Sequence, residues 1–360
     1  MKTKNVVVFL FAMLCLLLPG HAAAESGYAV NKIRDLALIY QGGRHRIPWT
    51  VDQIEPYVVH KFADGHKEWL FDGYLFLEFA DGMECDYVAG YGKRAARKDD
   101  WERLMNRIFE KGKALDALNT CIENQKRELG DPGFKHKIVL TVPIPFQNQK
   151  DWGTLGSRKL DFSKTADAKR ACQWYIDEVT KRFKKAGLNN LELTGIYWVA
   201  EDTGRTFEGL PRQISTYVHR KGLEFVWIPY FKAKGYNNWR NLGFDIAYHQ
   251  PNYFFNKSVP ESRIDEACKI ARENGMAMEF ECDQRALLQN KDSYFDRMEA
   301  YLDGFERNGV FDRSAIAYYT DSHLLLDFIN NPHPRHQAIM DRLARHIADR
   351  RKIPSLIPRR

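Results

Sequence analysis

Three glutamates at the ends of two apolar runs are the residues best suited to do chemistry in this sequence. Glu201 follows the run at residues 194–200. Glu279 and Glu281 lie in the run at residues 276–282, on one face of the strand, while the large apolar side chains share the other face. Burying carboxylates is costly unless they are paired, hydrogen-bonded or protonated. Because the sequence places these carboxylates on buried strands despite this cost, a functional role for the glutamates is favoured.

Two carboxyl groups that face each other across a cavity can cleave a glycosidic bond. One protonates the departing oxygen, and the other attacks the anomeric carbon or activates the water that does. We expect Glu201 to be the acid/base and Glu281 to be the nucleophile, because Glu281 lies one pleat nearer the strand end than Glu279. Glu279 would orient Glu281 or contact the sugar. In the structural alternative, Glu201 caps the following loop and Glu279 pairs with a buried Arg or Lys.

Eight short apolar runs along the chain would position these glutamates, and most are followed by a segment of helical periodicity. Strands that alternate with helices predict a parallel sheet, and eight of them predict an α/β fold, a closed (β/α)8 TIM barrel. An open doubly wound sheet is the alternative, but no run is followed by a Gly-x-Gly-x-x-Gly loop. The runs lie at residues 36–40, 74–79, 137–143, 194–200, 225–230, 244–248, 276–282 and 315–319.

Helical stripes with defined ends separate several of these runs. The stripe from Cys172 to Phe183 stops at Gly187, and similar stripes stop at Gly275 and Gly309. The segment near Trp239 is short and poorly patterned. We expect one domain over residues 25–348, with insertions after the second and third strands at about 93–131 and 146–160, and a basic tail over 349–360.

Residues after the other runs are of the types that bind sugars at the carboxyl ends of barrel strands. Aromatic rings stack on apolar C–H faces, while amides, imidazoles and carboxylates bond to hydroxyls. Each such residue taken singly more often has a packing or turn role, so the prediction depends on their coincidence on one face. His249 and Tyr230 are expected nearest the scissile bond. The expected substrate contacts are Glu279, Gln41, Trp49, Trp152, Trp198, Tyr230, His249, Asn252, Tyr253 and Asp321.

Composition excludes several classes of protein. With 44% hydrophobic and 28% charged residues in 360, the chain can bury a large core, which excludes disordered, fibrous and coiled-coil proteins. The net charge of +7 includes Lys2 and Lys4 and forms no stripe of the kind that binds nucleic acid.

Residues 1–24 read as a secretory signal peptide. Lys2 and Lys4 precede an apolar run at residues 6–18, which is shorter than the roughly 20 residues of a spanning helix. Small residues at 22–24 then provide a cleavage site. We therefore expect a secreted or periplasmic protein with no membrane segment after cleavage.

Cysteines and metal-ligand motifs point to no cofactor. The five cysteines after the signal are scattered, without a zinc spacing or a disulfide framework. No Gly-x-Ser-x-Gly elbow or phosphate-binding loop is present. A metal-dependent polysaccharide deacetylase using His249, Asp283, Glu201 and Asp321 is the weaker alternative, because none of these residues has a ligand spacing. We expect no metal and no cofactor.

Five segments carry a resemblance to a known family. They read Asp-Leu-Ala-Leu-Ile-Tyr-Gln-Gly-Gly at 35–43, Gly-Ile-Tyr-Trp-Val-Ala-Glu-Asp at 195–202, Ile-Pro-Tyr-Phe at 228–231, Phe-Asp-Ile-Ala-Tyr-His-Gln-Pro-Asn-Tyr at 244–253 and Gly-Met-Ala-Met-Glu-Phe-Glu at 275–281. They resemble the bacterial domain of unknown function 4855 family, over about residues 33–330. The resemblance implies an exported, glycosidase-like barrel in a polysaccharide setting, and it implies no particular substrate.

Two functions stay open at this point. The first is a glycoside hydrolase acting on a poly- or oligosaccharide through Glu201 and Glu281. The second is a non-catalytic glycan-binding barrel that keeps the aromatic mouth without a working acid pair. Carboxyl groups facing a shared open cavity favour the enzyme, and carboxyl groups buried in salt bridges favour the binding protein.

Overall fold

Eight parallel strands close into a barrel in a computed structural model that describes residues 27–204 and 206–356. Neighbouring strands follow the order β1-β14-β13-β12-β11-β10-β7-β4. Every predicted run forms one of these strands, so the (β/α)8 prediction is confirmed. The strands are β1 (Asp35–Tyr40), β4 (Gly73–Leu77), β7 (His136–Val142), β10 (Leu191–Trp198), β11 (Glu224–Trp227), β12 (Ile246–His249), β13 (Ala277–Glu281) and β14 (Ile316–Tyr319).

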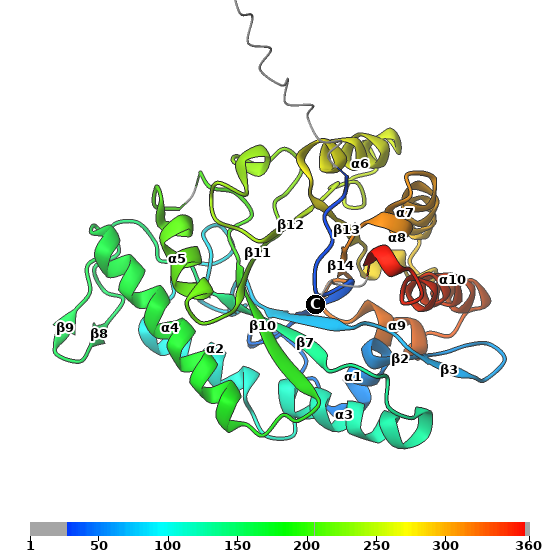
Figure 1. Cartoon of the computed structure of the whole chain (residues 1–360), viewed down its shortest axis with the longest axis horizontal. Helices are drawn as coiled ribbons and strands as arrows, with labels where there is room; N and C mark the ends of the chain where they lie inside the picture. The colour runs from blue at the N-terminus through cyan, green and yellow to red at the C-terminus, as the bar shows by residue number, and fades with distance from the viewer. Residues whose placement is uncertain (1–26, 205, 357–360) are drawn as a thin grey trace, which may run out of the picture.

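Helices surround the barrel strands (Figure 1). The predicted stripes form α4, α6 and α7, and α10 is the last α-helix of the described chain. Between β11 and β12 the described chain forms only a short 3-10 helix at Tyr236–Asn238, in agreement with the poor pattern there. The helices are α1 (Val51–Val58), α2 (Lys98–Ile108), α3 (Ala114–Leu129), α4 (Thr165–Lys185), α5 (Leu210–His219), α6 (Ser262–Asn274), α7 (Phe295–Arg307), α8 (Val310–Arg313), α9 (Leu324–Asn330) and α10 (Pro334–Arg350).

Helix α6 shows how an apolar stripe and a glycine define an element. Ile264, Cys268 and Ala271 are fully buried on one face, which packs the helix on the barrel. At its end, Gly275 adopts a left-handed φ of 58° and its N–H donates to the carbonyl oxygen of Ala271. Glycine takes this conformation without steric cost, so the helix ends where the sequence predicts.

Additional elements follow the second and third barrel strands, as predicted. The segment after β4 contains β5 (Cys85–Asp86), β6 (Arg94–Ala95), α2 and α3, and the segment after β7 contains the hairpin of β8 (Thr154–Leu155) and β9 (Arg158–Lys159). A further hairpin, β2 (Val59–Lys61) with β3 (Lys67–Trp69), follows α1. The two hairpins project from opposite sides of the barrel (Figure 1).

The expected signal peptide at residues 1–24 lies outside the described residues. Within the described ranges, no helix is both long and apolar enough to cross a membrane.

The strand register decides which side chains enter the barrel. Glu279 pairs with Ala317 and Glu281 with Tyr319 in the parallel ladder. Residues in register on neighbouring strands point to the same side, and residues one step along the strand point to the other. Successive strands therefore contribute alternate residues to shared interior layers.

Arg350 forms a buried ion pair at the amino-terminal end of the barrel. Its side chain is 1% exposed, and its Nε donates to Asp35 Oδ1 at 2.7 Å. The guanidinium also donates to the carbonyl oxygens of Ser314 and Arg34, at 2.7 and 3.0 Å. The start of the predicted basic tail is therefore a buried part of α10. The charge of Arg350 is buried there because its guanidinium pairs with a carboxylate and donates to several carbonyl groups. Residues 357–360 of that tail lie outside the described ranges.

Replacing Arg350 with methionine should strongly destabilise the fold. The Arg350→Met change leaves Asp35 and the backbone carbonyls without their donor in a dry environment, which costs about 3–5 kcal/mol. Urea unfolding of the purified protein measures this loss.

The matched control is Arg127→Met on the surface of α3, where Arg127 is 72% exposed and lies 3.8 Å from Glu123. This change should alter the free energy of unfolding by less than about 0.5 kcal/mol. Equal losses in the two variants would contradict the structural role given to Arg350.

Candidate active site

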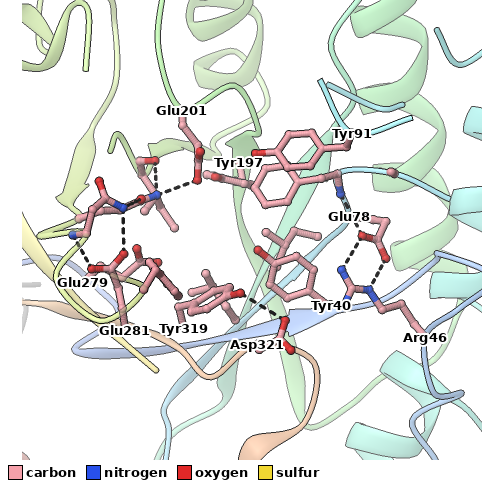
Figure 2. Close-up of a pocket in the computed structure, with 18 of the residues that line it drawn as sticks. Tyr40, Arg46, Glu78, Tyr91, Tyr197, Glu201, Glu279, Glu281, Tyr319 and Asp321 are labelled. Atoms are coloured by element: carbon pink, nitrogen blue, oxygen red, sulfur yellow. Dashed lines mark hydrogen bonds and ion pairs between the residues drawn. The ribbon is translucent and has the colours of Figure 1, made fainter. Parts of the chain in front are cut away.

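A cavity of about 430 Å³ lies at the carboxyl ends of the barrel strands. Glu201, Glu279 and Glu281 lie at one end of it, and an ion pair between Arg46 and Glu78 lies at the other (Figure 2). The tyrosines between them come from three different strands and are Tyr40, Tyr197 and Tyr319. This is the end of the barrel at which enzymes of this fold place their reactive groups.

Strand β13 directs two of the three glutamates into the cavity. Glu279 and Glu281 both line it, and their side chains are almost completely buried. Phe280, between them, points to the helices and packs its ring 5.3 Å from that of Tyr301 on α7. The predicted alternation along this strand is confirmed, because the polar and apolar residues differ enough to select opposite faces.

Uncharged donors hold the carboxylate of Glu281. Its Oε2 accepts from the backbone N–H of Asn252 at 2.7 Å and from the hydroxyl of Tyr301. Its Oε1 accepts from Asn252 Nδ2 at 3.2 Å. These bonds restrain the orientation of the carboxylate and favour its charged form.

Two amide side chains connect Glu281 to Glu201. Glu201 follows β10, and its Oε1 accepts from Gln250 Nε2 at 2.8 Å. The side-chain oxygen of Gln250, Oε1, accepts a hydrogen bond from Asn252 Nδ2 at 2.9 Å, and the same nitrogen also donates to Glu281. Asn252 adopts a left-handed φ of 48°, and its Oδ1 accepts from the backbone N–H of Phe231 at 2.7 Å. The bridge couples the positions of the two carboxyl groups.

The glutamates of β13 share an unfavourable electrostatic environment. Burial raises the pKa of Glu279 well above its ordinary value, and the charges of Glu281 and Glu201 raise it further. Burial also raises the pKa of Glu281, to about 8, against the lowering effect of Tyr301 and Asn252. Because no described residue donates a hydrogen bond to Glu279, this carboxyl group is the best place for a proton.

The far end of the cavity is built around a bidentate ion pair. Arg46 Nε and Nη2 donate to the two oxygens of Glu78 at 2.9 and 3.1 Å. Glu78 also accepts from the N–H of Gly43 at 3.0 Å. The guanidinium lies 4.5 Å from the centre of the Tyr40 ring, which fixes both side chains in the wall. These contacts restrain both side chains of the ion pair at this end of the cavity.

Five of the predicted site residues line the cavity: Glu201, Glu279, Glu281, Asn252 and Asp321. Asp321 accepts a hydrogen bond from Tyr319 at 3.2 Å. Asn252 directs its amide to protein groups, so its place in the structure is that of a positioning residue for Glu281. Tyr230 lies in an adjoining cavity, where its hydroxyl donates to Asp202 at 3.2 Å.

Three predicted contacts point away from the cavity, which corrects the expectation. Trp198 packs its ring 5.9 Å from Phe225 outside the barrel. His249 is fully buried against Phe231, and Gln41 donates to the carbonyl oxygen of Arg107 at 3.0 Å. Each is one residue away from an inward position, and a one-residue step along a strand reverses the direction of the side chain.

Three further aromatic residues are core residues and do not line the cavity. Trp49 is buried and donates to the carbonyl oxygen of Tyr40 at 2.8 Å. Trp152 packs edge-on against Trp101 at 5.3 Å in the inserted segment. Tyr253 packs 5.5 Å from Tyr301. Their predicted sugar contacts are wrong because helices and insertions cover them.

Several wall residues were not predicted from the sequence. Tyr40, Tyr197 and Tyr319 lie on apolar strands whose sequences do not show which face points inward. Arg46 in the wall, and Tyr301 behind it, carry no local signal, because each reaches its carboxylate from a segment distant in the sequence.

Thiol groups and metal ligands form no second candidate centre among the described residues. The five cysteines within the described ranges are free and buried. In the same part of the chain, no group of three or more His, Cys, Asp or Glu residues has an arrangement that could hold a metal ion.

Solved structures of other proteins resemble this chain only distantly. A fungal β-1,4-galactanase is 10% identical, with a TM-score of 0.43 over 86% of this chain and 99% of that one. Tryptophan synthase from M. tuberculosis in an aminoacrylate-bound form is 9% identical, with a TM-score of 0.40 over 90% of this chain and 95% of that one. A mutant tryptophan synthase α-subunit from Pyrococcus furiosus is 10% identical, with a TM-score of 0.39 over 90% of this chain and 100% of that one. At TM-scores this low, these likenesses carry no argument about activity.

No curated protein matches the sequence. A family model described as domain of unknown function (DUF4855) matches residues 35–345, which include every barrel strand and the whole of the cavity wall described above. The chain belongs to the DUF4855 family.

Proposed function

We propose that this protein is a glycoside hydrolase that cleaves a poly- or oligosaccharide with Glu201 as acid/base and Glu281 as nucleophile. The observation that supports it best is the cavity in which both carboxyl groups lie, joined by the amides of Gln250 and Asn252. The hydrogen bonds to Glu281 come from uncharged donors, an arrangement that leaves its negative charge available for reaction.

In the first step the glycosidic bond breaks. The carboxylic acid of Glu201 gives its proton to the glycosidic oxygen, and the bond between that oxygen and the anomeric carbon breaks. A carboxylate oxygen of Glu281 bonds to the anomeric carbon, which forms a glycosyl ester and releases the leaving sugar as an alcohol.

In the second step water releases the product. The carboxylate of Glu201 takes a proton from water, and the water oxygen bonds to the anomeric carbon. The ester bond to Glu281 breaks, and both side chains return to their starting states. The sum of the two steps is the addition of one water molecule across the glycosidic bond.

Glu279 supports this cycle by holding a proton. Three interacting carboxyl groups in a buried site cannot all be charged without a large energetic cost. Tyr301 and Asn252 stabilise the charge of Glu281, whereas Glu279 has no such donor among the described residues. A protonated Glu279 adds no negative charge beside Glu281, which favours the ionised form of Glu281 that attacks.

The proposal includes export, on the basis of the signal sequence at residues 1–24. The substrate would then be a glycan outside the cytoplasm.

Substitution of either proposed catalytic glutamate should abolish most of the hydrolysis. Glutamine keeps the size of the side chain but neither attacks nor transfers a proton, so Glu201→Gln and Glu281→Gln should each lower kcat/KM by about 10²- to 10⁴-fold. The measurement is the release of reducing ends from a panel of polysaccharides and oligosaccharides.

Glu273→Gln is the matched control, because Glu273 is an exposed residue on α6 that lies 3.8 Å from Lys269. It should keep wild-type activity. Cleavage that survives in both catalytic variants would show that other residues do the chemistry. Azide added to a Glu281→Gly variant should yield a glycosyl azide, which identifies Glu281 as the group bonded to the anomeric carbon.

Removing the carboxyl group of Glu279 should change how stability depends on pH. Its folded pKa lies above the ordinary value of 4.5, so its contribution to stability is present below pH 4.5 and is lost as the pH rises towards the folded value. We therefore expect Glu279→Gln to lose less stability than the wild type as the pH rises above 4.5.

Urea unfolding at a series of pH values measures this effect, with Glu273→Gln again as the control. Parallel stability curves for the wild type and Glu279→Gln would contradict the assignment of the proton to Glu279.

A further inference from the structure

A second, smaller cavity of about 250 Å³ adjoins the first. It lies between the segment that follows β4 and the loop that follows β10. Phe79, Tyr91 and Glu201 line both cavities, so the two are neighbouring compartments of one site. Tyr230 and Asp202 line only the second.

Exposed aromatic rings distinguish the second cavity. Tyr91 is 55% exposed, and one face of its ring stacks on Phe79 with centroids 5.0 Å apart and planes 14° from parallel. Tyr230 is 36% exposed. Large apolar side chains are exposed at only five places in the described part of the chain, and two of them border this one cavity. A supported aromatic ring beside a polar group is suited to stack on the apolar face of a sugar.

The positions of the glutamates in the two cavities indicate how a sugar chain would be oriented in the site. Among the described residues, Glu201 is the only carboxyl group that lines both cavities, whereas Glu279 and Glu281 line the first alone. In the proposed reaction the anomeric carbon lies beside Glu281 and the departing oxygen lies beside Glu201. The bond that breaks must then cross from the first cavity to the second.

We infer that the second cavity is the subsite for the leaving sugar, with Tyr91 and Tyr230 as the residues that bind its ring. This inference rests on the proposed hydrolase function and adds to it. The sugar attacked by Glu281 occupies the first cavity, and the unit on its reducing side stacks against Tyr91. The carboxylate of Asp202, which already accepts from Tyr230, lies beside the hydroxyls of that unit. The substrate class is a glycan chain with at least one further sugar after the cleaved bond.

Two probes of the same sugar separate this subsite from the chemistry. A trisaccharide presents a sugar to the second cavity, whereas a glycosyl fluoride has a leaving group that needs neither a sugar subsite nor a proton from Glu201. Tyr91→Ala should lower kcat/KM on the trisaccharide by about tenfold, the scale of one lost aromatic contact. Hydrolysis of the fluoride should change by less than about twofold, because the first cavity stays intact.

Two further variants serve as controls. Tyr91→Trp keeps an aromatic face and should retain trisaccharide hydrolysis. Met83→Ala removes an exposed side chain, 60% accessible, from the same segment without touching either cavity, and it should leave both activities unchanged.

A Tyr91→Ala variant that loses activity equally on both probes, or on neither, would overturn the subsite and leave the hydrolase proposal standing. A wild-type protein that cleaves no glycan and no glycosyl fluoride would overturn the hydrolase proposal itself, and this inference with it.

Discussion

Closure of the parallel sheet is the constraint on which the rest of this structure depends. In a closed barrel every second side chain of each strand enters a common interior, and the register between strands sorts these side chains into layers. Glu281 lies in register with Tyr319, and Tyr40 lies in register with Leu77. Four segments far apart in the sequence therefore meet around one cavity, without any loop having to bring them there.

The two ends of the barrel deal with buried carboxylates in different ways. At the amino-terminal end, burial raises the pKa of Asp35, and the charge of Arg350 opposes this rise through a fully buried ion pair. At the carboxyl end, no cation of the described chain lies at hydrogen-bond distance from Glu279 or Glu281, and Glu281 is held by the neutral groups of Tyr301 and Asn252. The first arrangement stabilises the fold, and the second leaves two carboxyl groups of raised pKa in the wall of the cavity.

The face of a strand could be predicted only where its two sides differ in polarity. In β13, Glu279 and Glu281 alternate with Met278 and Phe280, and the prediction that the glutamates point inward is confirmed. Most other barrel strands are buried on both sides and read as continuous apolar runs, so their sequences do not reveal which residues face inward. The predicted contacts Trp198, His249 and Gln41 therefore lie on the other side from the cavity, whereas Tyr197 and Gln250, each next to one of them, line it.

The amino-acid sequence by itself determined the eight strands, the helical stripes between them and three acidic residues near strand ends. Those features follow from local periodicity and from the cost of burying charge, which are properties of short segments. Only the tertiary structure decided that Gln250 and Asn252 bridge the two carboxyl groups, that Tyr301 reaches Glu281 from α7, and that Glu201 stands between two cavities. These contacts join residues that are distant along the chain, and no local pattern records the closure and register that bring them together.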